Sequence, residues 1–276
     1  IMSMDFNQAA DLLKGKTALI TGASQGIGKE IAYRYERAGA DIAFTYISSK
    51  DITHKLEDEL TVRGVKCKGY RVNAADHDAT HEMVADVIKH FGRIDVLINN
   101  AGVGSAGAIE KSPIADVKKS FEVNLFGVVR MCQAVLPHMR HQKYGRIINM
   151  STLGSMIGLP FRAFYSSSKG AMDLMTEGMR LEVERYGIQA CTIHPGEVKT
   201  NISSRRIIST DENDETYGKT IKKAFDSLNA AVNHGKNPKL FGPYIEKIIN
   251  SNTVKRNYYI GTFDELLGIK LKKGLL

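Results

Sequence analysis

A tyrosine and a lysine four residues apart, Tyr165 and Lys169, stand at the start of a segment that is predicted to be one long helix over residues 165–186. Residues at positions i and i+4 share one face of a helix, so the lysine ammonium can lie beside the tyrosine phenol. An unperturbed tyrosine has a pKa of about 10, and a neighbouring cation lowers that pKa by favouring the phenolate. The spacing therefore predicts an acid–base pair in which Tyr165 exchanges a proton with a substrate oxygen.

A glycine-rich segment follows the first predicted apolar strand, residues 16–20. Gly22, Gly26 and Gly28 allow the backbone to turn tightly and to approach a ligand closely. The helix that comes next presents unpaired N–H groups and a partial positive charge at its N-terminus, which suits a pyrophosphate. Thr21–Gly28 therefore predicts a dinucleotide-binding loop.

The end of the second predicted strand, residues 41–46, bears on the choice between NAD and NADP. An Asp or Glu at this place would hydrogen-bond a ribose hydroxyl and repel a 2′-phosphate. The strand instead ends on Tyr46 and is followed by Ser48, Ser49 and Lys50, which suit a phosphate. We therefore expect NADP(H), with NAD(H) as the weaker alternative, although Ser49 could equally be the N-cap of the next helix.

Strands and helices alternate through most of the chain. Apolar strands are predicted over 16–20, 41–46, 64–72, 94–98, 146–150, 188–193 and 258–260, with helical patterns between them. This alternation is typical of crossover units and predicts a Rossmann-type, doubly wound parallel sheet in a three-layer α/β/α fold. Without a repeat or a low-complexity linker, we expect one domain over 1–276, in which about 200–250 form a substrate-covering loop and helices.

Composition narrows the function classes. The 276 residues are 43% hydrophobic and carry a formal net charge of +8, and the basic residues are dispersed, so we expect no nucleic-acid partner. Cys67, Cys132 and Cys191 are far apart, which predicts unpaired thiols in a reducing compartment and no metal site. No apolar run in the sequence is long enough to cross a bilayer and no leader is recognisable, so we expect a cytoplasmic protein without a membrane span.

Five motifs in order resemble the short-chain dehydrogenase/reductase family over about residues 15–200. They are Thr21–Gly28, Asn99–Gly102, Asn124 within Val-Asn-Leu-x-Gly, Tyr165-x-x-x-Lys169, and Pro195-Gly196 followed by Val198 and Thr200. The first half is most similar to the β-ketoacyl carrier-protein reductases, whereas the C-terminal part resembles lipid- and steroid-acting members. The resemblance implies hydride transfer between a nicotinamide and the carbonyl or secondary alcohol of a ketoacyl, steroid-like or other lipophilic substrate.

The resemblance also implies the role of each catalytic residue. Tyr165 is the acid and base, Lys169 also binds the nicotinamide ribose, and Asn124 holds a water that relays protons towards Lys169. The family's serine, thirteen places before the tyrosine, is replaced here by Thr152. Thr152 keeps the hydroxyl that polarises the carbonyl oxygen, although its β-branch makes it stiffer, and Ser151 is the alternative.

The cofactor-binding residues follow from the same resemblance. In chain order they are Gly22, Ser24, Gln25, Gly26, Ile27, Gly28, Tyr46, Ser48, Ser49, Asn73, Ala74, Asn100, Ala101, Gly102, Tyr165, Lys169, Pro195, Gly196, Val198 and Thr200. Gln25 departs from the family's pattern, because many NADP-using relatives carry Arg or Lys there. The Val198 backbone would meet the nicotinamide carboxamide and Thr200 other polar atoms of the cofactor.

Two other functions use similar residues. A nucleotide-sugar epimerase or dehydratase can also use Tyr-x-x-x-Lys, but the short chain and the Asn-Asn motif fit the reductases better. A non-catalytic NADP-binding sensor would need only the fold, and the intact set of Asn124, Thr152, Tyr165 and Lys169 argues against it.

The substrate pocket and the partners are less specified. Phe161 and Phe164 are expected to line the pocket, and the apolar, basic stretch 263–273 to form a core-capping helix, a solvated tail or a membrane contact. The helices predicted over 113–139 and 165–186 are apolar beyond one stripe, which predicts a homodimer or homotetramer. The residues behind this prediction are Val117, Phe121, Val128, Met172, Leu174, Met175 and Met179.

Overall fold

A computed structural model describes residues 11–47, 50–62 and 64–274, except for the side chains of Lys50, Ile52, Ser203 and 272–274. Seven strands form one parallel sheet in the order β3-β2-β1-β4-β6-β7-β9. These strands are β1 (Thr17–Ile20), β2 (Asp41–Tyr46), β3 (Cys67–Arg71), β4 (Val96–Asn99), β6 (Gly145–Met150), β7 (Ile188–Pro195) and β9 (Asn257–Ile260). The order reverses between β1 and β4, so a crevice opens there at the carboxyl edge of the sheet.

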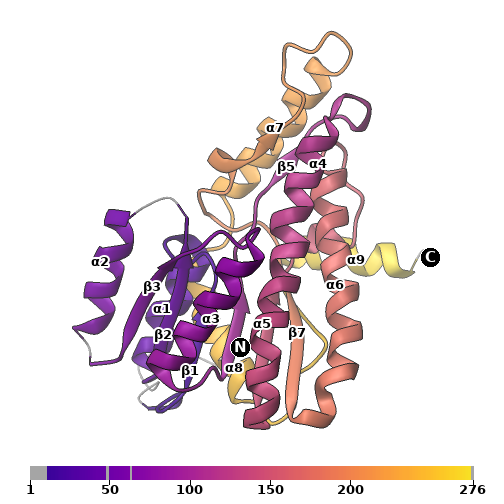
Figure 1. Cartoon of the computed structure of the whole chain (residues 1–276). Coiled ribbons are helices and arrows are strands. Elements are labelled where there is room, and N and C mark those ends of the chain that lie inside the picture. Colours follow the sequence, from indigo (N-terminus) through magenta and orange to yellow (C-terminus); the bar gives the residue numbers. More distant parts are fainter. Residues whose placement is uncertain (1–10, 48–49, 63, 275–276) are drawn as a thin grey trace.

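Helices cover both faces of the sheet, which confirms the predicted three-layer α/β/α fold (Figure 1). One face carries α1 (Gly26–Arg37), α2 (Lys50–Thr61) and α8 (Phe241–Asn250), and the other carries α3 (His77–Phe91), α5 (Gly127–Gln142) and α6 (Ala163–Val183). Along β1, Ala18 and Ile20 pack into the first layer and Leu19 into the second. The central strands β1 and β4 are buried on both faces, which is why their sequences are mostly apolar and show no polar alternation.

The segment between β4 and β6 is less regular than the single long helix that the sequence predicts. It contains α4 (Ile114–Phe121), a π-helical turn (Glu122–Phe126) and then α5. Such turns are rare and occur mostly at functional sites. The turn carries Asn124, whose side chain is completely buried.

The C-terminal third adds the elements that surround the cavity. The expected polar loop contains a short strand, β8 (Ile207–Ile208), which pairs in parallel with β5 (Ser105–Ala106). It leads to α7 (Gly218–Asn233), which extends beyond the sheet next to α4 (Figure 1). The final stretch forms α9 (Phe263–Gly274). In α9, Ile269 is buried while Phe263, Leu267 and Leu271 are exposed, so this helix both caps the core and keeps an apolar outer stripe.

The residues that suggested a partner subunit divide into two groups. Val128, Met172 and Met179 lie in the chain's own core, so they say nothing about a partner. Met175 also packs partly against that core. Leu174, by contrast, is 72% exposed on α6. The exposed apolar residues of this helical layer are Ile114, Phe126, Leu174 and Leu181.

Candidate active site

One cavity of about 530 Å³ opens at the carboxyl edge of the sheet, where the loops after β1, β2, β3, β4, β6 and β7 meet. Fifteen of the predicted cofactor residues line it together with Tyr165 and Lys169: Gly22, Ser24, Gln25, Gly26, Ile27, Tyr46, Asn73, Ala74, Asn100, Ala101, Gly102, Pro195, Gly196, Val198 and Thr200. Thr152 also lines it. Ser48 and Ser49 lie outside the described residues, as does the side chain of Lys50.

The glycine loop has the backbone that its sequence predicts. Gly22 and Gly26 have φ values of +65° and +60°, a region that disfavours residues with a Cβ. Gly28 does not line the cavity; a Cβ there would lie 2.5 Å from the Asn100 amide nitrogen. Gly28 therefore lets α1 pack closely against the Asn100 side chain. The amide of that side chain donates to the carbonyls of Thr21 and Gly22 at 3.0 and 3.1 Å.

The start of α1 is open to an anion. Its N-cap residue Gln25 makes no side-chain capping bond, and no acidic residue stands in the first turn. The first amides of a helix lack intrahelical partners, so this end offers N–H donors and a partial positive charge to a pyrophosphate. A Cβ on Gly26 would lie 3.5 Å from the Thr200 methyl group, which shows how closely the two cofactor loops approach. The residues present therefore fit a dinucleotide.

The predicted acid and base lie on one face of α6. Tyr165 and Lys169 are 7% and 4% exposed, and the Lys169 ammonium donates to the Met150 carbonyl at 2.7 Å. Burial lowers the pKa of Lys169 to about 8. Burial also raises the pKa of Tyr165, and this effect exceeds the lowering by Arg162, Thr152 and Arg206.

The expected lowering of the tyrosine pKa by the lysine is therefore wrong for this structure. The physical reason is that burial disfavours the phenolate more strongly than the neighbouring groups favour it, and Lys169 is not among the groups that lower this pKa. The cations that lower the pKa of Tyr165 are Arg162 and Arg206. The phenol is therefore protonated at neutral pH and has a proton to give, although the raised pKa makes it a weaker acid than an unperturbed tyrosine.

The two candidate hydroxyls face different groups. Thr152 interacts with the Tyr165 phenol, accepts a hydrogen bond from the Gly154 amide at 3.1 Å and lines the cavity. Ser151 also lines the cavity, but its buried hydroxyl faces Asp173, where it opposes the burial that raises the pKa of that carboxyl. The geometry thus brings Thr152, and not Ser151, to the phenol.

Asn124 lies beside Lys169 but outside the cavity lining. Its amide oxygen accepts from the Val103 amide at 3.0 Å, and its amide nitrogen donates to the Val103 carbonyl at 2.9 Å and to the Ser168 hydroxyl at 3.1 Å. The side chain therefore fixes the loop after β4 against α6. A Cβ on Gly102 would touch both the Asn124 oxygen and the Lys169 nitrogen, at 3.2 and 3.4 Å.

A partly buried carboxylate and a buried imidazole lie behind the lysine. Asp173 follows Lys169 by one helical turn and raises its pKa. The Asp173 carboxylate is 3.7 Å from Nδ1 of His194, which is 1% exposed and whose Nε2 bonds the Thr192 hydroxyl at 3.0 Å. Our sequence analysis missed both residues. The regular spacing of Tyr165, Lys169 and Asp173 was the available signal, since all three fall on one helix face.

The loop after β7 is held from the C-terminal end of the chain. The Glu265 carboxylate on α9 accepts from the Glu197 amide at 2.9 Å and from the Thr262 amide at 2.6 Å. Val198 pairs with Lys236 in an isolated parallel bridge. These contacts fix the position of the loop that carries Pro195, Val198 and Thr200.

The substrate side of the cavity differs from expectation. Phe161 and Phe164 do not line it; they border a separate, much smaller pocket, and the Phe161 ring packs edge-on against Tyr217. Phe161 lies in a turn with φ of +60°. The cavity is lined instead by three arginines, Arg162, Arg205 and Arg206, and by apolar side chains that include Leu228 and Val232 from α7.

Two features are absent from the part of the chain that the structure describes. No group of three or more His, Cys, Asp or Glu residues in the described chain is arranged to hold a metal ion. Within the same residues, no helix combines the length and apolarity needed to cross a membrane.

Comparisons with known proteins agree with this geometry. A family model described as short chain dehydrogenase matches residues 16–210. A 3-ketodihydrosphingosine reductase of Bacteroides thetaiotaomicron is 33% identical over 93% of this chain and 92% of its own length. A 3-oxoacyl-(acyl-carrier-protein) reductase of Staphylococcus epidermidis is 31% identical over 76% of this chain and 85% of its own. A solved short chain dehydrogenase from Burkholderia cenocepacia, in complex with NADP, superimposes with a TM-score of 0.76 at 25% identity, covering 91% of this chain and 98% of that one.

Proposed function

This chain belongs to the short-chain dehydrogenase family, and on that premise we propose that it is an NADP(H)-dependent reductase of a lipophilic ketone. Like its ketoreductase relatives, the chain is an oxidoreductase that acts on CH–OH groups. The observation that supports the finer proposal is that Thr152, Tyr165 and Lys169 line the same cavity as the glycine loop.

Each catalytic residue has a distinct task in this proposal. The nicotinamide cofactor, when bound, supplies the hydride in reduction and accepts it in oxidation. The Thr152 hydroxyl orients the substrate oxygen, and the protonated Tyr165 phenol gives its proton to that oxygen, so the carbonyl becomes an alcohol. Lys169 holds a positive charge near the phenol and the cofactor ribose. In the reverse direction Tyr165 takes the proton from the alcohol.

The preference for NADP(H) rests on the end of β2. Among the described residues there, Tyr46 stands where an acidic residue would repel a 2′-phosphate, and the side chain is buried against the sheet. Arg71 lies beside Tyr46 in the parallel register of β2 and β3, and it donates to the Ile47 carbonyl at 3.3 Å. This guanidinium is a phosphate partner that our sequence analysis did not include, and it offsets the missing cation at Gln25.

Two observations support a lipophilic substrate: the apolar part of the cavity lining and the substrates for which the relatives are named. Val103, Val123, Ile202, Leu228 and Val232 border the cavity. The relatives named above reduce ketones on long-chain lipid or carrier-bound acyl substrates, as their names state. The proposed substrate class therefore covers ketoacyl, steroid-like and other lipophilic ketones.

The assembly and location are also part of the proposal. Leu174 and Leu181 on α6 and Phe126, the last residue of the π-helical turn, are exposed apolar side chains, and they favour a homodimer or homotetramer. We place the protein in the cytoplasm, where its three free cysteines would stay reduced.

The test is reduction of a panel of ketones with NADPH absorbance as the readout, in the wild-type protein and in Tyr165→Phe. General acid catalysis contributes about a hundred- to ten-thousandfold, so kcat should fall by that factor while NADPH binding, measured by fluorescence, persists. Tyr186→Phe, in the short 3-10 turn that follows the C-terminal end of α6, is the matched control and should retain activity. A Tyr165→Phe enzyme with near-normal kcat would rule out the assigned acid.

A further inference from the structure

Three charged side chains from different segments surround Tyr165. Arg162 precedes α6, Glu197 follows β7, and Arg206 precedes β8. The Arg162 guanidinium lies 5.0 Å from the centre of the Tyr165 ring, and its Nη1 is 3.2 Å from the Glu197 carboxylate. All three line the cavity, so they meet whatever the phenol protonates.

The two guanidinium groups are close enough to repel each other. Burial and the charge of Arg162 both lower the pKa of Arg206, while Glu197 and Tyr165 oppose that shift. Of the described residues, Glu197 is the only acidic one among the groups that change the pKa of Arg206 or of Tyr165. Arg162, Arg206 and Glu197 together therefore carry a net positive charge of one beside the phenol.

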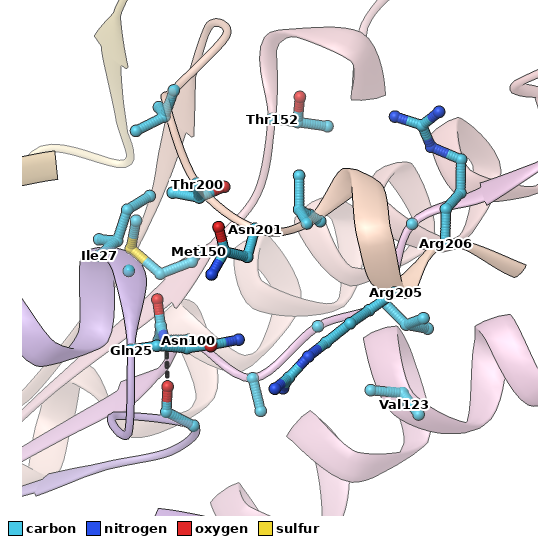
Figure 2. Close-up of a pocket in the computed structure, with 18 of the residues that line it drawn as sticks. Gln25, Ile27, Asn100, Val123, Met150, Thr152, Thr200, Asn201, Arg205 and Arg206 are labelled. Atoms are coloured by element: carbon cyan, nitrogen blue, oxygen red, sulfur yellow. Dashed lines mark hydrogen bonds between the residues drawn. The ribbon is translucent and has the colours of Figure 1, made fainter. Parts of the chain in front are cut away.

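Arg205 and Arg206 are adjacent in the sequence, but their side chains extend to opposite ends of the cavity. Figure 2 shows the Arg205 side chain extending towards Gln25 and Asn100, at the glycine-loop end. The Arg206 guanidinium instead points to the end at which Thr152 lies (Figure 2). Arg206 also stacks near the Phe225 ring of α7, with 5.9 Å between the guanidinium carbon and the ring centre. Its position is thus set by the elements that enclose the substrate.

Planar guanidinium groups bind carboxylate and phosphate oxygens through paired, charge-assisted hydrogen bonds. An oxyanion between Arg162 and Arg206 would relieve their mutual repulsion, and the low-dielectric surroundings would strengthen the attraction. A cationic group at the same place would add to the positive charge. The arrangement therefore selects for an anion next to the reacting carbonyl.

We propose that Arg206 and Arg162 form a subsite for an oxyanionic group of the substrate, so that the preferred ketone carries a carboxylate or phosphate close to its carbonyl. This inference rests on the proposed reductase function. It narrows the substrate to amphipathic keto acids, whose apolar chain would contact Leu228 and Val232 at the α7 side of the cavity.

The experiment compares four ketones with the same pentyl chain: β-ketooctanoate, its methyl ester, the corresponding β-keto phosphonate and the corresponding β-amino ketone. The wild-type enzyme with NADPH should show a kcat/KM at least about tenfold higher for an anionic ketone than for the ester, and lowest for the amine. The carboxylate and phosphonate arms tell which oxyanion the subsite prefers. In Arg206→Gln the ratio of anion to ester should fall towards one.

The controls separate charge from folding and from the neighbouring arginine. Arg206→Lys keeps the charge and should keep part of the preference, whereas Arg206→Glu should shift it towards the amine. Arg205→Gln removes an equal charge that points the other way and should leave the ratio of anion to ester unchanged. Equal turnover of ester and anions by the wild-type enzyme, or a ratio that Arg206→Gln does not change, would overturn the subsite.

A binding measurement distinguishes failure of this inference from failure of the proposed function. If the wild-type enzyme reduces none of the four ketones, the reductase assignment fails for this class. Calorimetric titration with β-ketooctanoate then still tests the subsite. Binding that is lost in Arg206→Gln but kept in Arg205→Gln supports it, and binding equal in all three proteins, or no binding, refutes it.

Discussion

Replacing Asp173 by Asn should change the pH at which this enzyme loses activity. Lys169 is buried, and burial lowers its pKa to about 8, while among the described residues the Asp173 carboxylate is the charge that raises it. Asn keeps the size and hydrogen-bonding capacity of Asp but removes the negative charge. The ammonium of Lys169 should therefore lose its proton more readily in Asp173→Asn.

The size of the shift follows from the helix. Side chains at i and i+4 have Cβ atoms about 5–6 Å apart, and an opposite charge within about 4–6 Å shifts a pKa by one to three units. We take the lower bound, about one unit or 1.4 kcal/mol, because His194 already offsets part of the Asp173 charge. The midpoint should fall from about 8 to about 7. Only the ammonium supports catalysis, so at pH 8 activity should drop about fivefold in the variant and stay nearly unchanged at pH 6.

The assay is the pH profile of kcat/KM for ketone reduction, together with an NMR titration of the Lys169 side chain in the cofactor-free protein. The lysine resonance would be assigned with Lys169→Arg. Glu177→Gln is the matched control, because Glu177 lies one turn further along α6 and pairs with Arg256 instead. An Asp173→Asn midpoint equal to that of the wild type, or one that moves to higher pH, would refute the reasoning.

Three further outcomes follow from the same structure. Tyr46→Asp places a carboxylate at the end of β2, so the preference for NADPH over NADH in kcat/KM should fall by about tenfold or more; an unchanged ratio would show that this position does not select the cofactor. Leu174→Glu puts a charge on a side chain that is 72% exposed on α6, and light scattering should show the assembly split into 30.5 kDa monomers; a monomeric wild type would reject the predicted dimer. Lys169→Met should abolish catalysis yet stabilise the fold against urea by about 2 kcal/mol at pH 7. The variant gains stability because the folded pKa of Lys169, about 8, lies below the unfolded value of 10.5. The lost hydrogen bond to Met150 reduces that gain by about 1 kcal/mol. That gain should vanish as the pH rises through the two values, and a destabilised variant at pH 7 would contradict the burial argument.

Local sequence patterns determined the framework of this protein. The alternation of apolar strands and amphipathic helices specified the parallel sheet, because the side-chain periods of strands and helices are properties of the backbone itself. The positive φ values of Gly22 and Gly26 likewise follow from their residue type at a tight strand-to-helix turn. Tyr165 and Lys169 share a helix face through their spacing alone, so these features could be predicted without the fold.

The chemistry around that framework depended on contacts between distant segments. The choice of Thr152 over Ser151 was open in the sequence, since adjacent residues leaving a strand point in opposite directions and only the packing decides which meets Tyr165. The anchoring of the β7 loop by Glu265 joins residues 68 positions apart. Neither the helix period nor the strand period relates residues that lie so far apart in the sequence.

Charges were the part that only the tertiary structure decided. The pKa of Tyr165 rises where the helix spacing alone predicts a fall, because burial disfavours the phenolate more strongly than the cations favour it. Arg162, Glu197 and Arg206 gather at the phenol from three segments, and Asp173 meets His194 behind Lys169. Desolvation and Coulomb interactions depend on which atoms surround a group in space, and the linear sequence does not specify those neighbours directly.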